Sequence, residues 1–303
     1  MPEITISVIV PVFNCETYLP ECLASIECQT MPNIEVLCVD DASTDGSASV
    51  IRAFAQDNPS FKLFNFKENQ GAAAARNFAI KQAQGEFLAF MDSDDWYPEP
   101  TTLEKLYRAA TEHKVSIAGG SFSEYRASTG ELVTDFSHDD YLARYFTFEK
   151  EELINYRNWQ GDYGYTRFLF KRDLITSNNI TFPLIARQED PVFFVHAMLA
   201  AGTFYAIPDV VYCCRTEHKS PYMSQAVARE GLAAVCGLIE LAAQENLPIL
   251  LKHQLELVDW FAFDAPIWRE HRSWKELGEI VGRQARDSLA LRLEHLSKQS
   301  KGE

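Results

Sequence analysis

The sequence predicts an α/β fold, with a mostly parallel sheet in the first part of the chain and a helical extension at the end. Short apolar, β-branched runs alternate with stretches of helical spacing over the first 120 residues, which is typical of βαβ units. Hydrophobic residues make up 47% of the sequence and charged residues 23%, which is typical of a folded protein and excludes a mostly disordered chain. The 303 residues suffice for one large domain with a smaller accessory part.

Strands and helices are expected to alternate through the first 120 residues. Each expected strand is a short apolar run, and each expected helix has apolar residues three and four positions apart. The strands are expected at 4–10, 34–39, 61–66, 86–91 and 115–118. The helices are expected at 16–28, around Val50 to Phe54, at 72–83 and at 101–113.

The second half of the sequence is less regular. Residues 121–165 are polar and aromatic with little periodicity, and a strand pattern returns at 165–170. Residues 203–214 predict strand pieces that are broken at Pro208, since proline cannot donate to a sheet ladder. From about residue 222 onward the spacing of apolar residues predicts helices.

The charge of the sequence argues against a nucleic-acid partner. The 43 Asp and Glu residues outnumber the 28 Lys and Arg residues, and the resulting net charge of −15 repels a phosphate backbone. The seven cysteines include no C-x-x-C pair, which favours buried, reduced thiols in a cytoplasmic protein over a zinc ribbon or a thioredoxin-like site. No apolar run reaches the ~18 residues of a spanning helix, and the N-terminus is typical of a strand, not a signal peptide.

Polar side chains follow three of the expected strands. Ligands of open parallel sheets bind beyond the carboxyl ends of the strands, so these clusters predict a site at that edge. The alternative is that Asp and Asn are simply good turn and cap residues. Three clusters on one edge favour a site. The residues concerned are Asn14, Glu16, Asp40, Asp41, Asp92, Asp94 and Asp95.

Asp92 and Asp94 are candidate ligands of a divalent cation. They stand two positions apart, directly after the apolar run EFLAFM. Carboxylates, water and phosphate oxygens are the ligands that Mg²⁺ and Mn²⁺ prefer, so a nucleoside diphosphate could complete the coordination. The alternative is a solvated turn, because a lone D-x-D is common; the position after the fourth strand favours the metal site.

Asp41 and Arg76 are candidate nucleotide-binding residues. The carboxylate of Asp41, after the second strand, could accept a hydrogen bond from the imide of uracil or from a ribose hydroxyl. Arg76 could lie against the base and Asp41, or form a surface ion pair that contributes little. Asp45 and Ser47 are more typical of caps for the following helix.

Glu189 and Asp190 form the remaining acidic pair. Asp190 is expected to be the N-cap of a helix with Pro191 at its first position and Gly202 just past its end. Asp190 could also be a general base, kept ionised by the helix N-terminus. The sequence leaves the cap and the base as equal alternatives.

Together these residues resemble the inverting family 2 glycosyltransferases of GT-A fold. The order and spacing of the motifs are highly specific, and the glycine fingerprints of dinucleotide-binding and P-loop enzymes and the G-x-S-x-G elbow are absent. The resemblance covers about residues 4–220. Its segments are SVIVPVFNCETYLPECLASIECQT, VDDASTDGS, NQGAAAARNFAI, GEFLAFMDSDDWYPEP, FLFKRDLITSNNITFP, ARQEDPVFFVHAMLAAG and VVYCCRTEHKS.

The resemblance implies a Rossmann-like, mostly parallel sheet and a role for each matched residue. Asp41 would hold the base of a nucleotide-sugar donor, with a UDP-sugar favoured, while Arg76 flanks the base and Asp92 reaches the ribose. Asp94, together with Asp92, would hold Mn²⁺ or Mg²⁺ on the diphosphate, and Asp190 would be the catalytic base. The residues implied in donor binding are Pro11, Val12, Phe13, Glu16, Asp41, Arg76, Asp92 and Ser93.

The departures from the family pattern narrow the expected activity. The Q-x-x-R-W motif of processive synthases is missing and no transmembrane helices follow, which favours transfer of one sugar to a bacterial surface glycan or a lipid-linked oligosaccharide. The segment RTEHKS resembles a loop that closes over the diphosphate. Arg215, His218 and Lys219 are candidates for that role, with His218 as a further candidate metal ligand; a solvated basic turn is the alternative.

The expected organisation has three parts. Residues 1–220 would form the GT-A domain, with a nucleotide-binding half at 1–120 and an acceptor half at 121–220, and residues 221–303 a helical region. Aromatic and basic residues are dense after Trp260, so this region could touch an anionic membrane at the inner face of the cell membrane. Packing onto the main domain, or onto a second copy in a homodimer, is favoured.

Two other functions remain as alternatives. A sugar-phosphate nucleotidyltransferase would need a Gly-rich, basic loop after the first strand, and VPVFNCETY has neither Gly nor Lys. A non-catalytic scaffold would be expected to lose Asp94 or Asp190, and both are present.

Overall fold

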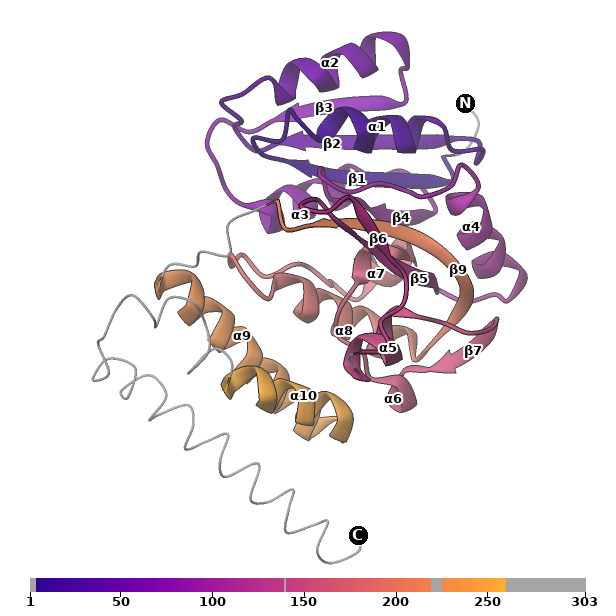
Figure 1. Cartoon of the computed structure of the whole chain (residues 1–303), viewed down its shortest axis with the longest axis vertical. Coiled ribbons are helices and arrows are strands. Elements are labelled where there is room, and N and C mark those ends of the chain that lie inside the picture. The colour runs from indigo at the N-terminus through magenta and orange to yellow at the C-terminus, as the bar shows by residue number, and fades with distance from the viewer. Residues whose placement is uncertain (1–3, 139, 219–224, 260–303) are drawn as a thin grey trace, which may run out of the picture. The chain divides into compact units, whose positions relative to one another are not determined.

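The computed structural model describes residues 4–138, 140–218 and 225–259. Within these residues the strands form one nine-stranded sheet in the order β3-β2-β1-β4-β8-β5-β9-β7, and β6 pairs with β5 (Figure 1). Parallel pairing joins β1 to β2 and β4, β2 to β3, and β5 to β9. The predicted α/β class with a mostly parallel sheet is confirmed.

The first half of the chain alternates strands and helices as expected. Residues of β1 are all buried, because a central parallel strand is covered on both faces. The elements are β1 Ile6–Val12, α1 Leu19–Glu27, β2 Ile34–Asp40, α2 Ser47–Asp57, β3 Phe61–Asn65, α3 Ala72–Gln82, β4 Phe87–Phe90 and α4 Thr102–Glu112.

The second half is more ordered than its sequence predicts. The antiparallel strand β8 joins β4 to β5, and β7 closes the far edge against β9. The elements are β5 Ile117–Arg126, β6 Glu131–Val133, α5 Asp140–Phe146, β7 Glu152–Asn155, α6 Tyr156–Trp159, the 3₁₀ turn Tyr165–Arg167, β8 Phe168–Lys171, α7 Arg172–Ser177, α8 Glu189–Ala201 and β9 Thr203–Thr216.

The expected break at Pro208 is wrong. Strand β9 runs unbroken through this residue, although its register against β5 shifts between Gly119 and Phe122. Ala206 pairs with Gly119 and Val210 with Ser121, so the residues around Pro208 bulge out of the ladder. A proline is tolerated there because a bulged residue does not donate a ladder hydrogen bond.

Aromatic packing fixes the end of β4, two residues before Asp92. The ring of Phe90 is fully buried, and four aromatic rings surround it at centroid distances of 5.4 to 5.9 Å. Well-packed rings of this kind hold a strand end in one position. The four rings are Tyr165, Phe170, Phe182 and Phe193.

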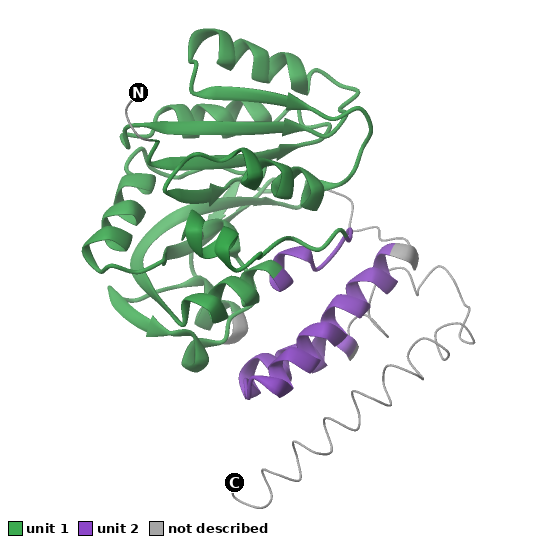
Figure 2. Cartoon of the chain, turned by 180° about the vertical axis from the view of Figure 1, so that it is seen from behind, with its two compact units in different colours: residues 1–184, 193–219 green, residues 185–192, 220–303 purple. Residues whose placement is uncertain are grey.

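The chain divides into two compact units, residues 1–184 with 193–219 and residues 185–192 with 220–303 (Figure 2). In the second unit, α9 Gln225–Gln244 and α10 Pro248–Asp259 pack against each other, so the predicted helical C-terminal region is confirmed. The aromatic and basic residues after Trp260 lie outside the described residues. Among the described helices, none combines the length and apolarity that crossing a membrane requires.

A buried carboxylate joins three strands near their amino ends, away from the predicted site at their carboxyl ends. Glu35 on β2 is 1% exposed and accepts hydrogen bonds from the Ser7 hydroxyl at 2.6 Å, the Lys62 ammonium at 2.7 Å and the Gln84 N–H at 2.6 Å. Burial raises the pKa of this carboxyl, but its three donors outweigh burial and hold the pKa below its usual value.

Replacing this carboxylate is expected to destabilise the sheet. Glu35→Gln should lower the free energy of unfolding by about 2 kcal/mol at pH 7, since hydrogen bonds to a buried charge are lost. A depressed pKa adds stability above the unfolded value of about 4.3, and this stability is lost as the pH falls through the folded value. Urea titrations should therefore show a difference from the parent that shrinks below about pH 4. The exposed Glu112→Gln is the matched control, and a pH-independent difference would contradict the prediction.

Candidate active site

A cavity of about 440 Å³ lies at the carboxyl ends of β1, β2 and β4, and we call it the sheet-edge cavity. Parallel strands bring their carboxyl ends to one edge, so segments far apart in the sequence meet there. Eight of the predicted site residues line it. The lining residues are Pro11, Val12, Phe13, Asp41, Asn69, Gly71, Ala72, Arg76, Asp92, Ser93 and Asp94.

Asp41 is buried at the floor of this cavity, where it orders the loop before α3. Its two carboxylate oxygens accept the N–H groups of Gln70 at 2.7 Å and Gly71 at 2.8 Å. Gly71 has a φ of +88°, a conformation that a glycine adopts without strain. Sequence reasoning missed this bond to the loop, and the expected contact of Asp41 with a base remains a prediction.

Arg76 is buried, so the surface ion pair considered for it is wrong. The guanidinium pairs with the Asp92 carboxylate at 2.9 Å, and only 5% of the arginine side chain is exposed. Its charge lies 5.4 Å from the ring centroid of Tyr165 and 5.3 Å from that of Phe182. Such a pair, held between aromatic rings, fixes the orientation of Asp92 at the cavity.

The acidic turn after β4 is not a solvated turn. Asp94 and Asp95 are 5% and 4% exposed, and Ser93 is 9% exposed. The Asp94 carboxylate lies 2.7 Å from Nε2 of His218, whose side chain is 7% exposed and packs edge-on against Tyr18. For His218, the alternative of a solvated basic turn is therefore wrong, whereas Lys219 lies outside the described residues.

Asp94 and His218 present a donor set that suits a divalent cation. A carboxylate and an imidazole already meet at hydrogen-bonding distance, and Asp94 lines the sheet-edge cavity. No group of three His, Cys, Asp or Glu ligands occurs among the described residues. Two protein ligands fit a site that diphosphate oxygens and water would complete.

Asp95 anchors the end of β9 to the same turn. Its carboxylate accepts the Tyr212 hydroxyl at 2.7 Å and the Arg215 N–H at 2.7 Å, while the Asp92 N–H donates to the Tyr212 oxygen at 3.2 Å. Burial, followed by the neighbouring charges of Asp92 and Asp94, raises the pKa of Asp95 well above its usual value. This anchor brings His218 next to Asp94. The sequence indicated Asp95 only as the third acid in DSDD.

The Arg215 side chain closes this arrangement. Its Nε donates to the Asp94 backbone oxygen at 3.0 Å, and its Nη2 pairs with Glu21 at 2.5 Å. The guanidinium lies 4.7 to 5.3 Å from three aromatic ring centroids, those of Tyr18, Trp96 and Tyr125. Arg215 is thus a structural clamp between β9, α1 and the acidic turn.

Glu16 does not line the sheet-edge cavity. Its carboxylate accepts the N–H of Gly46 at 2.5 Å, and its own N–H donates to Asp45 at 3.1 Å. The N-cap of α2 is Gly46, so the expectation that Asp45 and Ser47 cap this helix is wrong, although Asp45 accepts the N–H of Ser47, the first residue of α2, at 3.0 Å. Glu16 therefore braces the loop before α2, and its predicted place beside the nucleoside remains a prediction.

Asp190 is not the N-cap that the sequence predicts. Helix α8 begins at Glu189, so Asp190 is its second residue, and Gln188 before it has a φ of +68°. A residue of α9 contacts the turn before the helix, where the Ala186 N–H donates to the Glu230 carboxylate at 2.9 Å. Glu189 and Asp190 belong to the second unit and are described within it. Both residues lie in the first turn of α8.

Comparisons with known proteins identify the family of this architecture. The sequence model of glycosyl transferase family 2 matches residues 7–177. EpsH of Bacillus subtilis (strain 168) is 31% identical over 230 residues, which cover 74% of this chain and 63% of EpsH. The chain thus spans less than two thirds of that relative.

Two solved structures share the fold. S. aureus TarS 1-349 in complex with UDP-GlcNAc superposes with a TM-score of 0.72 at 23% identity, covering 95% of this chain and 81% of that one. The mannosyltransferase PcManGT of Pyrobaculum calidifontis, in complex with GDP-Man and Mn²⁺, has a TM-score of 0.57 at 20% identity over 96% of this chain and 79% of that one. Both likenesses place the mixed sheet among GT-A structures.

Proposed function

We propose a function for this chain on the basis of its family, because the chain belongs to glycosyl transferase family 2. The protein transfers a single sugar from a nucleotide-diphospho-sugar, with a UDP-sugar favoured, to a glycan or lipid-linked acceptor, and it inverts the anomeric carbon. The observation that carries the proposal is the sheet-edge cavity, where Asp41, Arg76 and Asp92 meet Asp94. The UDP-GlcNAc complex of TarS supports a UDP-sugar as donor.

The nucleoside would occupy the end of the cavity formed by β1 and β2. Phe13 is 48% exposed there, so its ring is available to contact a base or ribose. Asp41 supplies an acceptor at the floor, and each of its oxygens keeps a lone pair beyond the backbone hydrogen bond. Asp92, oriented by Arg76, would accept a ribose hydroxyl.

The diphosphate would lie beside the acidic turn. Mn²⁺ or Mg²⁺ would be held there by Asp94 and His218, with Asp92 as the additional candidate ligand. Such a cation, when bound, offsets the negative charge that develops on the departing diphosphate. The Mn²⁺ complex of PcManGT supports the use of a divalent cation. Asp95 and Arg215 keep the turn and His218 in register.

The acceptor would be activated by Asp190. Its carboxylate takes the proton of the acceptor hydroxyl, the hydroxyl oxygen attacks the anomeric carbon, and the nucleoside diphosphate leaves from the opposite face. Proton transfer of this kind contributes about 10²–10⁴-fold to the rate. Asp190 lies in the first turn of α8, where the helix dipole favours a negative charge.

The acceptor and the location of the protein follow from the same proposal. A single-sugar transferase of this family without a processive motif suits the assembly of a bacterial surface glycan at the cytoplasmic face of the membrane. The nucleotidyltransferase alternative is disfavoured, because the loop after β1 has no glycine or lysine to hold a triphosphate. A homodimer or a membrane contact through residues 221–303 is a further part of the proposal.

Thermal shifts with Mn²⁺ and UDP, GDP, CDP or TDP sugars test the donor. One nucleotide, UDP by preference, should stabilise the protein by about 2.7 kcal/mol when present at 100 times its dissociation constant.

Asp41→Ala should weaken UDP binding about tenfold or more in calorimetry, since a hydrogen bond to a charged group is lost. Binding of Mn²⁺ with pyrophosphate, which has no base, is the control and should be unchanged. Equal UDP affinity in variant and parent would count against the assignment.

A further inference from the structure

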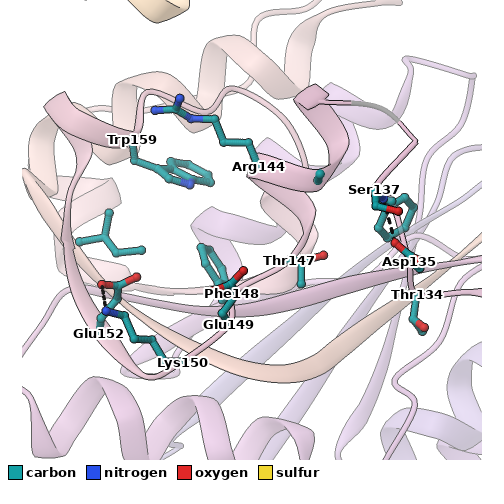
Figure 3. Close-up of a pocket in the computed structure, with 13 residues that line it drawn as sticks. Thr134, Asp135, Ser137, Arg144, Thr147, Phe148, Glu149, Lys150, Glu152 and Trp159 are labelled. Atoms are coloured by element: carbon teal, nitrogen blue, oxygen red, sulfur yellow. Dashed lines mark hydrogen bonds and ion pairs between the residues drawn. The ribbon is translucent and has the colours of Figure 1, made fainter.

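A second cavity, of about 540 Å³, lies in the segment that follows β6, and we call it the Trp159 cavity (Figure 3). Its walls come from residues 134–159, in the half expected to bind the acceptor. Among the described residues it shares no lining side chain with the sheet-edge cavity. Strands β8, β5 and β9 separate β4 from β7 in the sheet, so the two cavities are distinct.

One wall of the Trp159 cavity is aromatic and rigid. Phe148 and Trp159 both pack on the fully buried Arg167, whose guanidinium lies 4.8 and 5.9 Å from their ring centroids. Arg167 donates to the backbone oxygens of Gly120, at 2.7 Å, and Tyr145. Because a buried, hydrogen-bonded arginine holds both rings, this wall exists before any ligand arrives.

The indole N–H of Trp159 is a buried donor without an acceptor. Trp159 is 7% exposed, and none of the described residues offers its Nε1 a hydrogen-bond partner. Figure 3 shows the indole nitrogen on the edge of the ring that faces Phe148 and Glu149. A buried donor left unpaired costs about 1–3 kcal/mol, so an occupant that accepts from it would be stabilised.

Charged side chains also line the cavity, and its three acids, Asp135, Glu149 and Glu152, outnumber its two bases, Arg144 and Lys150. Figure 3 shows Glu149 next to Phe148 in the lining, and no hydrogen bond or ion pair joins its carboxylate to another described residue. Lys150 lies 3.4 Å from Glu152, which offsets its charge. The guanidinium of Arg144 extends over Trp159. These charges disfavour an anionic ligand.

We propose that the Trp159 cavity binds a neutral saccharide segment of the acceptor glycan, away from the sugar that is extended. Sugar hydroxyls both donate and accept, so they can pair with the Glu149 carboxylate and the Trp159 N–H together. The apolar C–H groups of a sugar ring suit the apolar surface that Phe148 contributes to the lining. The volume lies within the range of small-molecule sites. Identifying the saccharide as acceptor rests on the proposed function; saccharide binding itself does not.

Two-dimensional ¹H–¹⁵N NMR of the tryptophan indoles tests the proposal. The sequence has five tryptophans, and Trp159→Phe assigns the signal of Trp159 by its disappearance. Cellobiose, lactose and N,N′-diacetylchitobiose are titrated to millimolar concentrations without nucleotide or metal. At least one should shift the Trp159 signal saturably, and Glu149→Gln should weaken that binding about fivefold or more.

Glu112→Gln, an exposed acid on α4, is the matched control and should leave the disaccharide affinity unchanged. A Trp159 signal that none of the three disaccharides moves overturns the proposal, and so does an unchanged affinity in Glu149→Gln. These outcomes are separable from failure of the proposed function. Disaccharide binding in a protein that binds no nucleotide-sugar would sustain the site while rejecting the transferase.

Discussion

Asp94→Asn is expected to reduce sugar transfer by about 10³-fold or more, because several kcal/mol of charge stabilisation are lost and each 1.36 kcal/mol is tenfold. Asparagine is chosen over alanine since Asp94 is buried and its volume should be kept. The variant loses the negative charge that His218 contacts, so cation affinity should fall together with the rate. Initial rates with the donor selected above, measured across a Mn²⁺ titration, report both quantities.

Asp57→Asn, at the exposed end of α2, is the control for this experiment. It makes the same chemical change away from the cavity and should transfer at the parent rate. Full activity of the parent after treatment with EDTA would show that the cation assignment is wrong. Full activity of Asp94→Asn would move the assignment to Asp92.

Asp190→Asn is expected to reduce transfer by about 10²-fold or more, while the unfolding temperature and UDP affinity stay close to the parent values. Asparagine matches aspartate in volume but cannot accept the acceptor proton. The loss of a charge near the start of α8 should cost only about 0.3–1 kcal/mol of stability. Donor hydrolysis by water should fall as well, since water also needs a base.

Glu189→Gln is the matched control for Asp190, one residue earlier in the same helix turn. It should retain most of the transfer activity. An Asp190→Asn enzyme that keeps more than about a tenth of the parent rate would reject Asp190 as the base. A loss confined to Glu189→Gln would assign the proton transfer to Glu189 instead.

The parts of the fold that follow from local patterns could be predicted. The alternating apolar runs predicted the parallel strands of the first 120 residues. The D-x-D motif after an apolar strand predicted an acidic turn at the carboxyl ends of these strands. Periodicity failed between 121 and 165, because β6 and β7 are edge strands of three and four residues with little apolar repeat. Pro208 was misjudged since a bulge depends on the partner strand, which local sequence does not reveal.

Long-range pairing explains what the sequence did not predict at the candidate site. Arg76 was placed near the cavity by its motif, but its ion pair with Asp92 depends on how α3 packs on the strands. The bond between Asp95 and Tyr212 joins segments that no local pattern relates. Glu35 was overlooked because an acid within an apolar strand shows its role only through its three donors. Helix α8 begins two residues earlier than predicted, at Glu189 instead of Pro191, since both neighbouring acids favour a helix start.

The clamp that ties β9 to the acidic turn also governs when the site can form during folding. Tyr212 is 117 positions from Asp95, and Arg215 is 194 positions from Glu21. Closing such long loops is entropically costly, so contacts of this separation are expected to form late. Pulsed hydrogen exchange should protect the amides of β1 and β2 before that of Arg215, and simultaneous protection would contradict this order. A chain still emerging from the ribosome would therefore carry the acidic turn without His218, so donor chemistry would await nearly complete synthesis of the described sheet.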